Sequence, residues 1–273
     1  MAGDQSSSSF TTGNIAQEKG LDYVPGCYKV SSPNHPSLAR ETTLVPVIDM
    51  ARLRQDGGER SVIIREIGDA FHRSGFFQVS FLLIQPSDLV NHGICQEILD
   101  GALASALGFF NLPAQLKLQL KSDDVFKAVR YGGSFKDGVD KVQFWRVFLK
   151  HYSYPLDTWI DSWPKNPPQY REKMGNFSTE IRKLALELMK VITESLGLGR
   201  NYQSQKMEDG MQVITVNCHP PCPQPSLALG LPPHSDYSSL TILLQNSPGL
   251  EIGDSHDCKW RLVPELHGAL QIL

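Results

Sequence analysis

The most informative segment of this chain reads NCHPPCPQPSLALGLPPHSDYSSLTILLQNSPGLEI, residues 217–252. Prolines punctuate its first half, and a run of strand-forming apolar residues follows. Between the two parts lies a polar triplet, His234, Ser235 and Asp236. Because successive side chains on a strand alternate faces, His234 and Asp236 are expected to project the same way. The pattern therefore predicts an ionisable pair at the mouth of a buried strand.

An imidazole and a carboxylate on one face have a specific chemical use. They are two of the three ligands of the 2-His-1-carboxylate facial triad, which holds non-haem Fe(II) with open coordination positions. So short a motif also arises by chance, and a surface histidine beside a turn aspartate is the alternative interpretation. Spacing alone leaves both interpretations open.

Length and composition limit the class of protein. The 273 residues suggest one large or two modest domains, and 26 basic against 29 acidic residues give a formal charge of -3. No long run of either sign occurs, which argues against nucleic acid or an anionic membrane as partner. Five cysteines, an odd and sparse set, and a Ser-rich start without an apolar core predict a reducing, cytoplasmic setting. We expect a monomer that acts on a small-molecule substrate.

Hydrophobic periodicity predicts alternating helices and strands along the chain. The longest helix has Asn166 as its cap, prolines in its first turn, and one apolar stripe of Phe177, Ile181, Leu184, Leu188 and Val191. Other helices are predicted over residues 58–75, with Gly75 as the stop, and from Ile94 to before Pro113. The predicted strands cover residues 44–50, 76–79, 141–152, 211–217, 239–245, 250–254 and 260–264.

The segment 217–252 resembles the plant 2-oxoglutarate and Fe(II)-dependent dioxygenases, the family of flavonol synthase and anthocyanidin synthase. Upstream, LVPVIDM, GDAFHRSGFFQV, VNHGI, YGGSF and FWRVFLKHYSYP follow in the family's order. The resemblance implies an α+β fold, in which a double-stranded β-helix (jelly roll) packs against a helical N-terminal region. The polar, proline-punctuated start predicts an irregular arm at 1–43, and periodicity predicts the long core helix at 166–200. The resemblance covers residues from about 44 to the end and implies an N-terminal dioxygenase region at 44–165 and the dioxygenase domain at 208–273.

The same resemblance implies roles for individual residues. His234 and Asp236 match two iron ligands, and Asn217 with His219 matches the co-substrate motif NxYPPCP, with histidine in place of tyrosine. The implied reaction is hydroxylation or desaturation of a small plant metabolite. It uses Fe(II), 2-oxoglutarate and O2, with ascorbate as a candidate reductant.

The chain also departs from the family pattern, and the missing C-terminal residues favour a second hypothesis, a catalytically silent relative that binds at most a ligand or a protein. The family's distal histidine and Arg-x-Ser pair have no counterpart, and neither His256 nor His267 stands at the ligand position. We therefore expect a jelly roll that is incomplete at its C-terminus. Residues 80–89 interrupt two motifs that are contiguous in the family, and Val147 replaces an aspartate of many relatives.

Overall fold

The computed structural model describes residues 20–32, 35–36, 40–54, 58–79, 93–135, 142–202, 204–253, 257 and 259–273. The chain forms two compact units. The first unit combines Met1–Ala39, Ser105–Arg171 and Met211–Ser235, and the second combines Arg40–Ala104, Glu172–Gly210 and Asp236–Leu273. Each unit is therefore built from segments that are far apart in the sequence.

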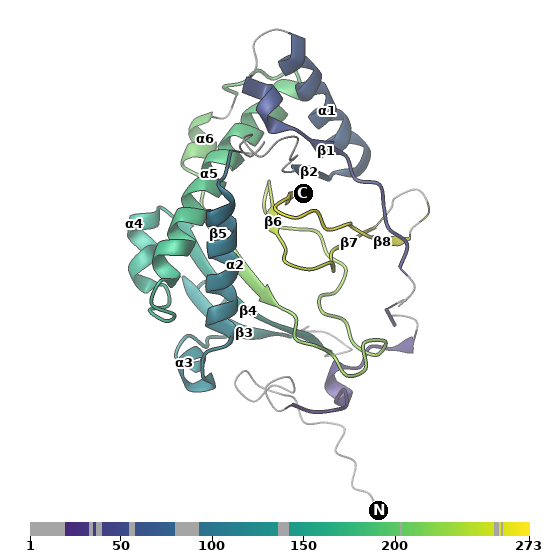
Figure 1. The fold of residues 1–273 in the computed structure, drawn as a ribbon, viewed down its shortest axis with the longest axis vertical. Helices are drawn as coiled ribbons and strands as arrows, with labels where there is room; N and C mark the ends of the chain where they lie inside the picture. Colours follow the sequence, from purple (N-terminus) through teal and green to yellow (C-terminus); the bar gives the residue numbers. More distant parts are fainter. Residues whose placement is uncertain are drawn as a thin grey trace, which may run out of the picture. The chain divides into compact units, whose positions relative to one another are not determined.

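A mixed four-stranded sheet in the second unit has the order β1-β2-β9-β6. Figure 1 labels β1, β2 and β6 of this sheet. Its strands are β1 (Val47–Ile48), β2 (Phe77–Val79), β9 (Leu270–Ile272) and β6 (Ile242–Leu244). The first pair is parallel, whereas β9 runs antiparallel to both of its neighbours. The strand nearest the C-terminus thus occupies an inner position, although no strand was predicted there.

The helices of the second unit follow the predicted periodicity. Helix α1 (Gly58–Ser74) buries Ile63, Ile67 and Ala70 on one stripe. It ends at Gly75, which has a φ of 63° and donates its N–H to the Phe71 carbonyl at 3.0 Å. Helix α5 (Tyr170–Ser195) contributes the predicted stripe to the core that the sheet also lines. A short 3-10 turn η3 (Met50–Arg54) and helix α6 (Ser204–Glu208) complete this unit.

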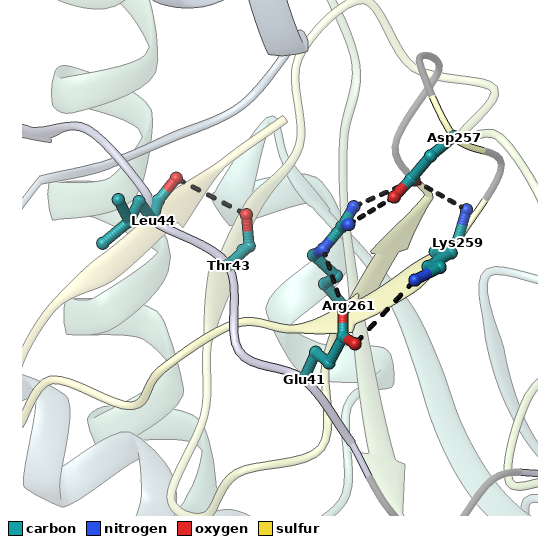
Figure 2. Close-up of polar contacts among 6 residues, drawn as sticks. All are labelled: Glu41, Thr43, Leu44, Asp257, Lys259 and Arg261. Atoms are coloured by element: carbon teal, nitrogen blue, oxygen red, sulfur yellow. Dashed lines mark hydrogen bonds and ion pairs between the residues drawn. The ribbon is translucent and has the colours of Figure 1, made fainter.

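A charged cluster joins residues 41–43 to the hairpin of β7 (Glu251–Gly253) and β8 (Trp260–Leu262). The Leu262 N–H donates to the Glu41 carbonyl at 2.8 Å, which adds this segment alongside β8. Figure 2 shows the Glu41 carboxylate between Arg261 and Lys259, at 3.6 and 3.9 Å, while Arg261 also pairs with Asp257. Backbone and side-chain bonds together hold this segment to the hairpin.

An antiparallel sheet with the order β3-β4-β5 forms the centre of the first unit. Its strands are β3 (Val129–Phe135), β4 (Gln143–Tyr154) and β5 (Gln212–Cys218). One face of β4 is buried, and there His151 Nε2 lies 2.9 Å from the Tyr170 hydroxyl and its ring 4.2 Å from that of Trp163. This unit also contains η1 (Gly26–Tyr28), α3 (Ala114–Leu118), α4 (Leu156–Trp159) and η4 (Ile160–Ser162). Helix α2 (Gln96–Phe110) begins in the second unit and ends in the first.

The structure confirms the α+β class and most predicted elements, with two corrections. Asn166 does not cap the long helix, because Pro167 and Pro168 lead into a turn and the first helical residue is Tyr170, whose N–H donates to the Pro167 carbonyl at 2.9 Å. His234 and Asp236 do not lie on a strand, because the ladder with β9 pairs only Ile242–Leu244. The predicted interruption at 80–89 lies outside the described residues.

Candidate functional site

The face of the β3-β4-β5 sheet opposite His151 gathers polar side chains around the buried ring of Phe148. We call it the open face because Asn217 is exposed on it. Phe148 of β4 lies opposite Asn217 of β5, and Lys150 lies opposite Arg130 of β3. Arg146 shares this face because it stands two residues before Phe148 on the same strand. The open face therefore combines three cations, an amide and an aromatic ring.

Arg146 is the centre of these contacts. Its Nη1 donates a hydrogen bond to Asn217 Oδ1 at 2.9 Å, which fixes the orientation of that amide. Its guanidinium carbon also lies 5.2 Å from the centre of the Phe148 ring, and the guanidinium carbon of Arg130 lies 4.8 Å from the same ring. Phe148 is thus in cation–π range of two arginines.

The electrostatics reflect this concentration of like charge. Burial, and then the charge of Arg130, lower the pKa of Arg146 to about 10. Burial and Arg130 also lower the pKa of Lys150, while Asp124 opposes the shift. A positive field that lowers the pKa of neighbouring cations also attracts anions.

His219, directly after β5, is the candidate co-substrate residue next to Asn217. Desolvation of its ring lowers its pKa and Arg146 lowers it further, whereas a hydrogen bond with the Trp145 backbone opposes both effects. The imidazole is therefore neutral at neutral pH. Its ring lies so close to Gly230 that a Cβ at that position would stand 2.6 Å from Nδ1. Only glycine leaves room for the ring there.

Trp145 holds the proline-rich segment after β5 against the sheet. Its indole Nε1 donates to the carbonyls of Pro220 and Pro221 at 3.1 and 3.3 Å. Its backbone N–H donates to the Leu229 carbonyl at 2.8 Å, so the segment is anchored at both ends. Burial raises the pKa of the Cys222 thiol, which disfavours its reactive thiolate form.

The two predicted iron ligands lie in the loop that leads to β6, and both residues are exposed. His234 Nδ1 lies 2.9 Å from the Pro232 carbonyl and donates a hydrogen bond to it. That bond engages Nδ1, as in histidines that ligate metals through Nε2. The chemistry of the pair therefore fits Fe(II).

A complete metal cluster does not appear in the described part of the chain. No group of three or more His, Cys, Asp or Glu side chains is placed to hold a metal ion among those residues. His267 is exposed in a turn, and His256 lies outside the described residues. The loop therefore offers two donors, His234 and Asp236, of the three that the facial triad needs.

Sequence reasoning missed Arg130 and Arg146. Arg130 directly precedes the motif YGGSF, and Arg146 lies within FWRVFLK. In the sequence, both motifs point to the family and not to individual site residues. Alternation along β4 would place Arg146 and Lys150 on one face. The partner strand β3 was not predicted, so its arginine had no assigned neighbour.

Comparisons with known proteins identify the family of the chain. The non-haem dioxygenase N-terminal family matches residues 45–169, and the 2OG-Fe(II) oxygenase superfamily matches residues 211–273. Flavanone 3-dioxygenase 3 of Oryza sativa subsp. japonica is 41% identical over 84% of this chain and 66% of its own length. The 2-oxoglutarate-dependent dioxygenase 21, chloroplastic, of the same plant is 41% identical over 93% of this chain and 72% of its own length.

A solved structure gives the same result for the fold. The crystal structure of JOX2 in complex with 2OG, Fe and JA superposes with a TM-score of 0.78 at 29% identity, over 94% of this chain and 70% of that chain. This chain spans 66 to 72% of the length of the first curated relatives. Among the described residues, every helix is too short or too polar to cross a membrane. The chain belongs to the 2OG-Fe(II) oxygenase superfamily, within the plant 2-oxoglutarate-dependent dioxygenases.

Proposed function

We propose that this chain carries the iron-binding and 2-oxoglutarate-binding residues of an oxygenase that hydroxylates or desaturates a small plant metabolite. The observation that carries the proposal is the hydrogen bond from His234 Nδ1 to the Pro232 carbonyl, beside Asp236 in a family segment. It presents Nε2 as a metal ligand. Flavanone dioxygenases among the relatives support a small-molecule substrate.

His234 would hold the metal through Nε2, and Asp236 would supply an anionic oxygen. Bound iron supplies the coupling of O2 reduction and 2-oxoglutarate decarboxylation to substrate oxidation. The Pro232 carbonyl keeps the His234 ring oriented, because it accepts the proton of the other nitrogen. The residues thus position the metal without taking part in bond cleavage.

Asn217 and His219 would bind the co-substrate. Arg146 holds the Asn217 side-chain oxygen, so the amide N–H2 is directed away from that bond and is suited to donate to a carboxylate. His219 is neutral and carries one ring N–H. Ascorbate is proposed as the reductant that maintains Fe(II).

We also propose that the protein is a cytoplasmic monomer without nucleic-acid or membrane partners. Its formal charge of -3, without long runs of one sign, supports the absence of polyanionic partners. Size-exclusion chromatography with light scattering tests the monomer, and a fluorescent fusion tests the compartment. A dimer mass or an organelle signal would refute the corresponding part.

Titration of the chain with Co(II) as a stand-in for Fe(II), followed by calorimetry and visible absorption, tests the metal site. We expect His234→Ala and Asp236→Ala each to abolish binding, because two protein donors cannot be reduced to one without loss of the chelate. The matched control is His267→Ala, which removes an exposed turn histidine and should leave binding unchanged. Unchanged affinity in both ligand variants would overturn the assignment.

A further inference from the structure

Three cations, Arg130, Arg146 and Lys150, gather on the open face of the β3-β4-β5 sheet, where the carboxylate of Asp124 acts on Lys150. Arg130 and Lys150 are cross-strand partners, and Arg146 approaches the same Phe148 ring as Arg130. Like charges directly opposite one another on a sheet destabilise it. In the part of the chain that the structure describes, no carboxylate forms an ion pair with Arg130.

Arg130 also carries an unsatisfied donor. Its Nε is buried and meets no hydrogen-bond acceptor among the described residues. A buried donor without an acceptor is costly, and a donor on a charged group more so. An acceptor that carries negative charge would satisfy the donor and offset the repulsion among the cations.

Guanidinium groups favour one kind of anion. Their planar fork of N–H donors matches a carboxylate, with which it forms paired, charge-assisted hydrogen bonds. Both guanidinium groups lie near one ring, at 4.8 and 5.2 Å from its centre, and the charge of Arg130 acts on Arg146.

We infer that Arg130 and Arg146 bind the carboxylate of the primary substrate, which is therefore a small organic acid. The inference rests on the proposed oxygenase function and names the substrate class of that site. Arg146 also orients Asn217, so it would connect the substrate acid to the co-substrate residue.

The position of Arg130 distinguishes the primary substrate from 2-oxoglutarate. Arg130 lies on β3, and β4 separates that strand from β5, which carries Asn217. Neighbouring strands lie about 4.8 Å apart, so the two strands are about 10 Å apart. An acid held at Arg130 would lie on the side of β4 away from Asn217, whereas Arg146 contacts Asn217 itself. The dependence of binding on Arg130 therefore separates the primary substrate from the co-substrate.

Ligand-observed NMR on the metal-free, co-substrate-free 273-residue chain tests the inference with trans-cinnamate and its amide as probes. We expect the acid to bind and the isosteric amide to bind far more weakly. Arg130→Gln and Arg146→Gln should each lower the affinity for cinnamate by about 10- to 100-fold. Arg73→Gln, which removes an exposed arginine of α1, is the matched control and should change nothing.

Circular dichroism checks the fold of each variant. If Arg146→Gln does not fold, Arg130→Gln still decides the question, because the Arg130 substitution leaves the hydrogen bond between Arg146 and Asn217 in place. Equal binding of acid and amide, or unchanged cinnamate binding in a folded Arg130→Gln, would overturn the inference. A higher affinity for glutarate than for cinnamate, lost in the arginine variants, would also overturn the inference. The arginines would then bind the co-substrate. The Co(II) titration is independent: its failure refutes the metal site and leaves the acid-binding result standing.

Discussion

Replacement of Gly230 by alanine probes the candidate co-substrate residue directly. The new Cβ would lie 2.6 Å from His219 Nδ1 and 3.1 Å from Cε1. Ordinary contact begins at 3.4 Å, so the ring must retreat by about 0.8 Å. Overpacking typically costs about 1 to 3 kcal/mol. His219 is exposed as a residue although nearby atoms desolvate its ring. The ring can therefore rotate toward water, and we expect about 1 kcal/mol, at the lower end of that range.

A double-mutant cycle with urea unfolding measures this cost. In a His219→Ala background the obstructing ring is absent, so Gly230→Ala should cost almost nothing, and the difference is the coupling energy. Gly249→Ala is the matched control, because its Cβ would meet no atom within 4 Å. An equal cost of Gly230→Ala with and without the His219 ring would refute the reasoning.

The same substitution should change the titration of His219. Its pKa lies below the ordinary value because the surrounding atoms desolvate the ring. A ring displaced toward water should recover a pKa closer to about 6.5. Two-dimensional NMR of the imidazole measures this shift, and a pKa that falls further in Gly230→Ala would show that the ring moves inward instead.

Two further predictions concern stability. His151 is buried with a pKa lowered to about 3, so the unfolded chain binds one more proton than the folded chain between that pH and about 6.5. The free energy of unfolding should fall as pH falls through this window, by at most about 1.4 kcal/mol per pH unit. In His151→Gln, the urea midpoint should depend less on pH between pH 5 and 7 than it does in the unchanged chain. The same pH dependence in both chains would contradict this. Leu188 is 0% exposed in the core of the second unit, so Leu188→Ala should lower the free energy of unfolding by about 2 to 5 kcal/mol. Leu196 is 66% exposed, so Leu196→Ala should lower it by under about 0.5 kcal/mol. Similar losses of stability in urea unfolding would place Leu188 outside the core.

Local patterns were sufficient to predict the long elements. Helices α1, α2 and α5 repeat their apolar residues with a period that their own backbone geometry imposes. Strand β4 is rich in aromatic and β-branched residues, which favour a strand. The motif at 217–252 likewise identified the family, because it lies within one continuous segment. Residues that are close in the sequence carry this information without reference to the rest of the chain.

Pairing between distant segments could not be predicted in the same way. Strand β9 has three residues and no period of its own, and it exists because Gln271 lies opposite Gln78 of β2 and Leu243 of β6. The extent of that pairing also left His234 in a loop rather than on a strand. Strand ends follow from the partner strand as much as from propensity.

The arginine cluster shows the same division at the candidate site. Asn217, His219, His234 and Asp236 were found because they stand in a recognisable motif. Arg130 and Arg146 come from different strands, and only the register of β3 against β4 brings both guanidinium groups to the Phe148 ring. Register is a property of two strands together, so the charge that we assign to the substrate became visible only in the folded sheet.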